Sequence, residues 1–301
     1  MVIRVFAGAL GASVVCLSGA ALAAPIPEPV VRMITEAARS GDAGALAITT
    51  DLAKRTNPNS LPEIDMLVAG LQAEAEAARV AALSDQDFFE GWSGEGEIGA
   101  TLTSGTSENT SVAAGVTLTK ESLEWRHTLT GIANYQKSDG VTTANRFLAG
   151  YEANYKFSER FWVLGLLQWE QDEFAGFTRR FTESLGLGYS LIDTPELVWD
   201  VSGGPAFRQT RYVTGMEDSD IAARAATHLM WNLAAGTVLT EDAGVYLGGS
   251  SNTYYSTTAL TSQLIEDISA RISFSVVMES NPPPGIAETN TISRFTLVYS
   301  F

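Results

Sequence analysis

Residues 268–279 read ISARISFSVVME, and residues 295–301 read FTLVYSF. In both stretches every second side chain is apolar, as at Ile272 and Phe274 in the first and at Leu297 and Tyr299 in the second. The positions between them are mostly serine, threonine or charged residues. A period of two places successive side chains on opposite faces of a β-strand, so each stretch predicts a strand with one apolar and one polar face.

The same alternation continues through the chain from Gly91 onward and predicts twelve strands. They lie at about 91–103, 108–119, 122–136, 141–157, 160–172, 177–191, 196–212, 220–239, 242–249, 253–265, 267–280 and 289–301. A closed sheet in lipid requires this regularity, because lipid-facing side chains must be apolar and no edge can stay open. The sequence therefore predicts an all-β fold, a closed antiparallel transmembrane β-barrel of about twelve strands. Ten or fourteen strands are the alternatives, because residues 240–265 alternate weakly.

A soluble β-sandwich also has alternating strands and is the alternative fold. Aromatic residues near the predicted strand ends favour the barrel, because they suit two interfacial girdles. They are Trp92, Trp125, Tyr135, Tyr155, Phe157, Phe161, Trp169, Phe177, Tyr189 and Trp199. In addition, Phe295, Leu297, Tyr299 and Phe301 resemble the C-terminal assembly signal of bacterial outer-membrane barrels. That resemblance implies outer-membrane lipid and the barrel-insertion machinery as partners, and the cell outer membrane as the location.

An even number of strands places both ends of the barrel in the periplasm. One set of connections between the strands is short and predicts periplasmic turns. These are Lys120-Glu121-Ser122, Ser158-Glu159, Asp193-Thr194-Pro195, Thr240-Glu241-Asp242 and Glu266-Asp267. The other set predicts extracellular loops and comprises Ser104 to Ser107, Lys137 to Gly140, Thr214 to Ser219 and Asn281 to Glu288.

Residues 1–23 have the pattern of a cleaved signal peptide. Arg4 supplies a positive charge, an apolar stretch follows, and Ala21-Leu22-Ala23 is a small-x-small cleavage pattern, so the mature chain is expected to begin at Ala24. A membrane anchor is the alternative, but the apolar stretch is short and ends in a cleavage pattern. Cys16, the only cysteine, lies in this segment, so the mature chain is expected to use neither a disulfide nor a thiolate metal site.

The remaining chain divides into two regions, 24–88 and the barrel at 89–301. In the first region apolar residues recur at helical spacing, with stops at Gly41 and Asn57-Pro58, which predicts three helices. This periplasmic helical segment is a candidate for binding a protein partner. The formal net charge of −16 argues against nucleic acid as a partner, and no cofactor is expected.

Several short motifs resemble the YdiY-type salt-induced outer-membrane proteins, a family whose domain has no known function. They are Gly94-Glu95-Gly96 with Gly99, Ser104-Gly105-Thr106, Gly186-Leu187-Gly188-Tyr189, Gly203-Gly204-Pro205, Ser256-Thr257-Thr258-Ala259-Leu260, Asn281-Pro282-Pro283-Pro284-Gly285 and Leu297-Val298-Tyr299-Ser300-Phe301. The resemblance covers about residues 90–301. It implies an outer-membrane barrel and carries over no catalytic residues.

The alternation also predicts a charged lumen with eight acids and eight bases. The acids are Glu95, Glu97, Glu124, Glu152, Glu170, Asp172, Asp200 and Glu279, and the bases are Arg126, Arg146, Lys156, Arg180, Arg208, Arg224, Arg271 and Arg294. Such a set can form a charged constriction that selects solutes, or an internal ion-pair network that fills a narrow barrel. The balance of signs favours the network, because a selective pore would carry an excess of one sign.

A lipid hydrolase is a less favoured reading, because the only two histidines, His127 and His228, are not placed at the extracellular rim where such a site would meet lipid. Glu217, Asp218 and Asp220 could touch a cation, but loop acids are usually only solvated. The sequence therefore predicts neither a catalytic nor a metal site. It predicts a structural barrel or narrow passive channel, linked to envelope or salt stress by the resemblance. The alternative is a membrane anchor that presents the helices of 24–88 to a periplasmic protein.

Overall fold

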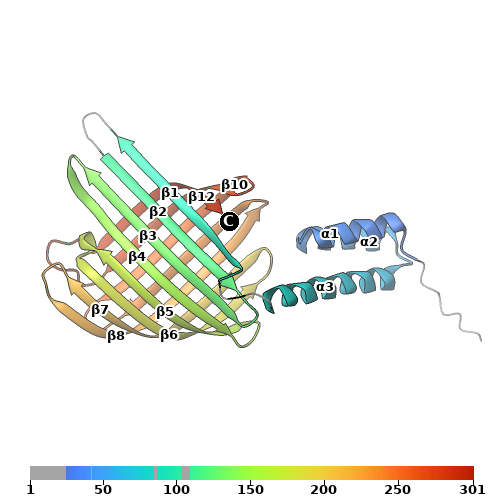
Figure 1. Ribbon diagram of the computed structural model, residues 1–301, viewed down its shortest axis with the longest axis horizontal. Coiled ribbons are helices and arrows are strands. Elements are labelled where there is room, and N and C mark those ends of the chain that lie inside the picture. Colours follow the sequence, from blue (N-terminus) through green and yellow to red (C-terminus); the bar gives the residue numbers. More distant parts are fainter. Residues whose placement is uncertain (1–24, 42, 85–86, 88, 104–108) are drawn as a thin grey trace, which may run out of the picture. The chain divides into compact units, whose positions relative to one another are not determined.

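The computed structural model describes residues 25–301 except 42, 85–86, 88 and 104–108 (Figure 1). The predicted signal peptide at 1–23 lies outside the described residues. The chain divides into two compact units between Ala77 and Ala78, within the last of three helices. The first is helical and the second is dominated by strands.

The helical unit is built from α1 (Glu28–Arg39), α2 (Ala43–Thr56) and α3 (Leu61–Ser84), the three helices that the sequence predicts. Its core is small, with Ile34, Ala53 and Ile64 fully buried, one from each helix. The Ser60 carbonyl accepts the first hydrogen bond of α3, from the amide of Ile64 at 3.0 Å. No helix among the described residues has the length and hydropathy needed to cross a membrane.

The second unit is a closed antiparallel barrel of twelve strands, as predicted. The strands are β1 (Trp92–Thr103), β2 (Asn109–Glu121), β3 (Trp125–Ser138), β4 (Val141–Lys156), β5 (Phe161–Asp172), β6 (Phe177–Asp193), β7 (Leu197–Tyr212), β8 (Glu217–Ala234), β9 (Thr237–Leu247), β10 (Asn252–Ile265), β11 (Ile268–Glu279) and β12 (Thr289–Ser300). Each strand pairs with its neighbours in sequence, and β1 pairs with β12 to close the barrel. A short helix, η1 (Glu173–Ala175), lies between β5 and β6.

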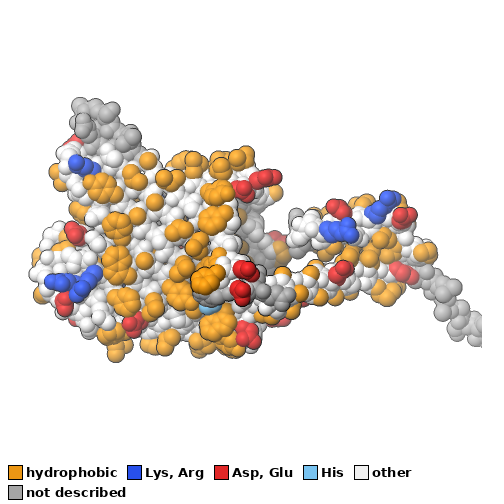
Figure 2. All heavy atoms as spheres, in the orientation of Figure 1, with side chains coloured by type: hydrophobic (Ala, Val, Ile, Leu, Met, Phe, Trp, Pro, Cys, Tyr) orange, Lys and Arg blue, Asp and Glu red, His pale blue; other side chains and the backbone are white. Residues whose placement is uncertain are grey.

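The outer face of the barrel is apolar. Large side chains such as Ile221 (74% exposed), Leu187 (61%) and Ile272 (60%) point away from the lumen, and Figure 2 shows apolar side chains spread over the visible wall. Aromatic pairs lie near one end, as in Phe161 and Tyr189, whose rings are 4.5 Å apart. In a closed sheet every backbone N–H and C=O group can be hydrogen-bonded to a neighbouring strand, as lipid requires, and an apolar exterior with aromatic girdles is typical of barrels that span a membrane. The protein is an outer-membrane β-barrel.

The end of the barrel that holds both Trp92 and Ser300 has short connections, at 122–124, 157–160, 194–196, 235–236 and 266–267. The longest described connection, 280–288, lies at the opposite end and contains Pro282, Pro283 and Pro284, which cannot join a ladder. Short turns characterise the periplasmic end of such barrels, so we assign the end with both termini to the periplasm.

One predicted turn is wrong. Thr240-Glu241-Asp242 lies inside β9, and the connection between β8 and β9 is Ala235-Gly236. Gly236 has a φ of +72°, a left-handed conformation that lets so short a turn close. The polar triplet lies within a strand, and the turn depends on a single glycine. Similarly, β8 begins at Glu217, inside the loop predicted for Thr214 to Ser219.

Candidate functional site: the charged lumen

The lumen holds one cavity of about 900 Å³, lined by inward-facing side chains from β1 and β3 to β12 and by Thr117 and Thr119 of β2. All fourteen charged residues that form the core of the predicted lumen network line this cavity. They are Glu95, Glu97, Arg126, Arg146, Glu152, Glu170, Asp172, Arg180, Asp200, Arg208, Arg224, Arg271, Glu279 and Arg294. These side chains point inward because successive residues of a strand face opposite sides of the sheet, and the neighbours of each charged residue face the lipid.

A buried ion pair narrows the extracellular end of the cavity. Arg180 Nη1 and Glu279 Oε1 lie 2.6 Å apart, with side chains only 5% and 8% exposed. Thr253 donates to both oxygens of Glu279, at 3.1 and 3.0 Å, and the guanidinium of Arg180 lies 3.9 Å from the centre of the Phe177 ring. Because a buried ion pair is tolerated only when its remaining polar atoms are also satisfied, these contacts hold both side chains in place.

Arg208 lies beside this pair and, like Arg294, has no carboxylate partner among the described residues. It is 7% exposed and forms no ion pair within the described part of the chain. Its guanidinium lies 4.8 Å from the centre of the Tyr246 ring, and its Nε atom has no hydrogen-bond partner among the described residues. A cation–π contact stabilises a guanidinium but leaves its N–H groups available. Arg208 can therefore donate to an anion that enters the cavity.

Two further acids, Glu170 and Asp172, lie around the constriction. Arg146 Nη2 lies 3.5 Å from Glu170 Oε1. Asp172 accepts a hydrogen bond from the Ala175 amide at 3.0 Å and so caps η1. Below them, Arg224 donates to Ser202 at 3.1 Å and lies 4.0 Å from Glu152. These side chains extend the network down the lumen.

The periplasmic half has a second cluster. Arg271 pairs with Glu95 at 2.7 Å and with Glu97 at 3.3 Å, which joins β11 to β1 across β12. His228 Nδ1 and Asp242 Oδ1 lie 2.6 Å apart on β8 and β9. Asp200 of β7 accepts a hydrogen bond from Ser190 at 2.7 Å. No guanidinium pairs with Asp200 or Asp242 among the described residues.

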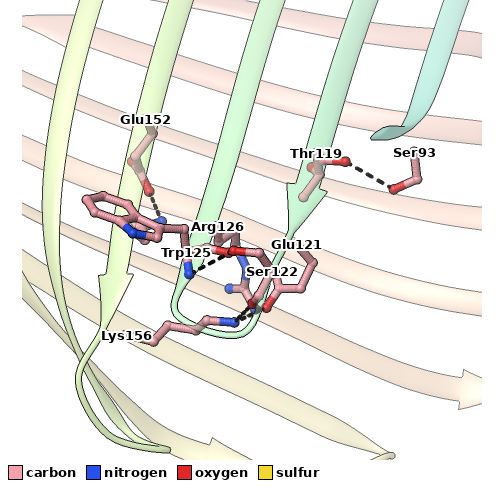
Figure 3. A network of polar contacts seen from close by, with 9 residues as sticks. Ser93, Thr119, Glu121, Ser122, Trp125, Arg126, Glu152 and Lys156 are labelled. Atoms are coloured by element: carbon pink, nitrogen blue, oxygen red, sulfur yellow. Dashed lines mark hydrogen bonds and ion pairs between the residues drawn. The ribbon is translucent and has the colours of Figure 1, made fainter. Parts of the chain in front are cut away.

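Figure 3 shows the network at the periplasmic rim, where Glu121 binds two bases. Its carboxylate lies 2.7 Å from Arg126 Nε and 2.6 Å from Lys156 Nζ. The sequence placed Glu124 in the lumen, but Glu124 lies in the turn at 122–124, outside the strands. Glu121 replaces it as the acid of this cluster, because β2 continues two residues further than the alternation predicts.

Among the charged residues that line the cavity, the balance of sign differs between the two ends of the barrel. In the half nearer the extracellular end, Arg146, Arg180, Arg208, Arg224 and Arg294 face three carboxylates, those of Glu170, Asp172 and Glu279. In the half nearer the periplasm, Glu95, Glu97, Glu152, Asp200 and Asp242 face two guanidinium groups, those of Arg126 and Arg271, and the imidazole of His228. The sequence predicted the overall balance but not this separation, since it placed Asp242 in a turn.

Trp162 fills part of the lumen from β5. Its ring lies against Gly188 of β6, and a Cβ atom at Gly188 would clash with it. Tyr246 and Tyr255 project inward from β9 and β10 with ring centres 6.2 Å apart. These aromatic side chains, which the sequence did not single out as lumen residues, narrow the lumen at two levels: Trp162 near the periplasmic end, and Tyr246 and Tyr255 in the extracellular half.

The predicted C-terminal signal residues lie on the outer face. Phe295, Leu297, Tyr299 and Phe301 are 63%, 48%, 53% and 58% exposed. The backbone of Phe301 exchanges two hydrogen bonds with Gly94, at 2.8 and 2.9 Å. A Cβ atom at Gly94 would lie 2.8 Å from the Phe301 ring, so the glycine permits this approach. Phe301 therefore closes the barrel against β1.

The histidines and loop acids take the following positions. His127 is on the outer face of β3, where Nδ1 lies 2.9 Å from the Tyr151 hydroxyl and the ring stacks on Trp125. His228 is in the lumen with Asp242. Asp220 accepts hydrogen bonds from the amides of Gly249 and Ser250. Within the described ranges, no group of three or more His, Cys, Asp or Glu side chains has metal-binding geometry.

A model of the family described as protein of unknown function, DUF481, matches residues 96–301. The chain belongs to this family. No curated protein matches the DUF481 chain. Solved structures similar to it include the NanC porin, which is 10% identical in sequence. The match covers 69% of this chain and 98% of the porin chain, with a TM-score of 0.44. Others are an outer-membrane channel of Pseudomonas putida F1 (12% identity, 72% and 100%, TM-score 0.43) and the translocator domain of the autotransporter NalP from Neisseria meningitidis (14% identity, 76% and 96%, TM-score 0.37).

Proposed function

We propose that this DUF481 protein is a narrow passive channel whose lumen is held nearly closed by paired charges. The single observation that carries the proposal is the cavity, which is lined by residues from both ends of the barrel. Twelve strands lie between the eight-stranded barrels that side chains fill and the porins of 16–18 strands that hold an aqueous channel. The lumen of this protein is accordingly open in part and constricted by Arg180, Glu279 and Arg208.

Conductance of the purified, refolded protein in a planar bilayer tests this proposal. The native protein should show small, resolvable current steps, because the buried Arg180–Glu279 pair bridges β6 and β11 inside the lumen and narrows it. A barrel boiled in detergent before reconstitution provides the inactive control. Complete absence of current steps would support a purely structural barrel, and large steps with weak ion selectivity would support an open porin instead.

A role in envelope or salt stress is the finer part of the proposal and rests on the resemblance to salt-induced outer-membrane proteins. The periplasmic-half pairs support it physically. Glu95 is 47% exposed in its pair with Arg271, so added salt screens this interaction more than the buried Arg180–Glu279 pair. A rise in salt would therefore loosen one end of the lumen first.

The alternative function is a membrane anchor that presents the helical unit to a periplasmic protein. Its supporting observation is that Ile48, Met66 and Leu52 are 72%, 66% and 51% exposed on so small a unit. Exposed apolar side chains of this size are typical of a surface that binds another protein.

Deletion of residues 25–88 should separate the two functions. The barrel has its own closed hydrogen-bonded sheet, so we expect the truncated chain to insert and to retain the current steps of the full protein. If the anchor is the main function, affinity purification should lose a periplasmic partner that the full chain retains. As a matched control, Ile48→Ser and Met66→Ser together change only the exposed surface. Loss of insertion in the truncated chain would contradict the assignment of the barrel as an independent unit.

We propose no enzymatic activity for the chain. Of its two histidines, His228 is bound to Asp242 in the lumen and His127 lies beside Tyr151 on the outer face of the periplasmic half. A lipid hydrolase would need such a group at the extracellular rim. The proposed partners of the barrel are outer-membrane lipid and the insertion machinery that reads its last strand.

A further inference from the structure

The seam, where β1 pairs with β12, has a much shorter ladder than any other strand pair of the barrel. Its register covers residues 95–98 of β1 and 297–300 of β12, next to the bonds between Gly94 and Phe301. On its other side β1 pairs with β2 along its whole length, from Trp92 to Thr103. Residues 99–103 of β1 and 289–296 of β12 therefore have no ladder partner on the seam side, and we call them the unpaired seam.

The two strands overlap where the ladder ends. Gly99 shares the lumen-facing side of β1 with Glu97, and a Cβ atom at Gly99 would lie 3.0 Å from the Phe295 carbonyl oxygen and 3.0 Å from Thr296 Cγ2. β12 therefore passes on the lumen side of β1 at this point. Ala113, the β2 partner of Gly99, does not line the cavity. The edges of the sheet thus lie one over the other here and are not joined by hydrogen bonds.

The unpaired seam borders the outer leaflet of the membrane. The paired part lies beside the chain ends, which we assign to the periplasm, so the unpaired part extends toward the extracellular end. A strand edge presents N–H and C=O groups, and hydrocarbon offers them no hydrogen bond. The overlapping strands can separate here without loss of ladder hydrogen bonds, whereas the other strand pairs would have to break a full ladder.

A guanidinium without an acid lies on the lumen side of the unpaired seam. Arg294 precedes Phe295 on β12 and lines the cavity, and it has neither an ion pair nor a hydrogen bond with any residue that the structure describes. Glu97, on the facing strand, lies 3.3 Å from Arg271 and accepts a hydrogen bond from Thr296 at 3.3 Å. Arg294 is therefore free to bind an anionic group, for which a guanidinium offers two parallel N–H donors.

We propose that the unpaired seam is a lateral passage between the lumen and the outer leaflet for an amphipathic anion, a molecule with an acyl chain and an acidic headgroup. The headgroup binds Arg294 and accepts hydrogen bonds from N–H groups of the strand edges. The acyl chain lies against the outward side chains of Ile98 and Phe295, which are 64% and 63% exposed. This passage goes beyond the axial channel proposed above and does not depend on it, because it joins the lumen to the membrane.

Photo-cross-linking of the purified full-length protein in phosphatidylcholine vesicles tests the passage. The probe is a long-chain fatty acid with a diazirine near its methyl end, and peptide mass spectrometry locates the labels. We expect saturable labelling concentrated on β1 and β12 beside the unpaired seam, and weak labelling by the fatty alcohol of the same chain length. Arg294→Gln should reduce the fatty-acid labelling several-fold, because the headgroup loses its guanidinium partner.

Arg179→Gln is the matched control, because it removes one positive charge from an arginine that is 58% exposed and far from the seam on β6. It should leave the labelling unchanged. Heat-modifiable migration on gels verifies that both variants are folded. Equal labelling of the Arg294→Gln variant and the native protein would overturn the proposal, as would labels spread evenly around the barrel.

A covalent bridge across the unpaired seam separates the passage from the axial channel. Residues 24–301 contain no cysteine, so Ala100→Cys and Phe295→Cys introduce the only pair there. A short bis-maleimide that joins them should abolish the fatty-acid labelling and leave the axial current of the native protein. Ala100→Cys alone, treated with the same reagent, should keep the labelling. Labelling that persists in the bridged protein would overturn the passage. Arg294-dependent labelling in a native protein without axial current would support the passage and contradict the channel.

Discussion

Simultaneous replacement of Arg146, Arg180 and Arg208 by Ala should raise the single-channel conductance several-fold above that of the native protein. The three guanidinium groups crowd the extracellular constriction, and Arg180 alone binds Glu279 at 2.6 Å, donates to Thr210 and covers the Phe177 ring. Truncation to Ala removes the bulk of these side chains and leaves Glu170 and Glu279 without their bases. The residual current should also shift toward cations, because rings of unpaired acids favour them.

The matched control is Arg179 with Arg211, both replaced by Ala. These arginines lie on the same strands, β6 and β7, but are 58% and 49% exposed at the outer face, where both bind Glu217. Their replacement by Ala changes the net charge without opening the lumen, so the native conductance should persist. Conductance and ion selectivity are measured in planar bilayers with a salt gradient. An unchanged conductance in the triple variant would show that the constriction lies elsewhere in the barrel.

Deletion of Phe301 should remove most of the protein from the outer membrane. Phe301 is the last residue of the alternating terminal strand, and its backbone exchanges two hydrogen bonds with Gly94 at the point where the barrel closes. Without Phe301 the assembly signal lacks its terminal aromatic residue. The pairing of β1 with β12, the seam that closes the barrel, also loses its last two hydrogen bonds. We expect the truncated chain to accumulate in the periplasm and to be degraded there.

Immunoblots of outer-membrane and periplasmic fractions measure this effect. Phe301→Tyr is the control, because it keeps an aromatic ring and the terminal backbone, and it should retain most of the membrane-inserted protein. Gly94→Ala separates the seam from the signal, since its Cβ atom would meet the Phe301 ring without altering the last strand. Native membrane levels after deletion of Phe301 would exclude the residue as part of the signal.

Alternation alone predicted the faces of the strands well, because the face of a side chain depends only on local backbone geometry. All fourteen network residues line the cavity for that reason. The partners of each charge could not be predicted in this way. Arg180 reaches Glu279 and Arg271 reaches Glu95 across long stretches of sequence, and which inward residues meet depends on the tilt and stagger of the closed sheet.

The wrong turn predicted at Thr240-Glu241-Asp242 also gave the wrong positions for two acidic side chains. Because a turn was assigned to these residues, Asp242 was missing from the predicted lumen and Glu241 from the predicted outer face. The turn is formed by Gly236, and its left-handed φ of +72° is set by tertiary pairing of β8 and β9, including a bulge between Asn232 and Ala234. A rule that treats polar triplets as turns cannot detect a glycine turn that follows a run of apolar residues.

The distribution of charge among the cavity-lining residues makes the wall of the cavity electrically polar along the barrel axis. Arginine-rich walls lie toward the outside of the cell and carboxylate-rich walls toward the periplasm. In the proposed channel, mobile anions should be enriched beside the arginines and mobile cations beside the carboxylates. A voltage of one sign drives both kinds of ion toward the middle of the pore, and the opposite voltage depletes it. We therefore expect any current through the proposed channel to rectify, with a direction fixed by how the chain inserts.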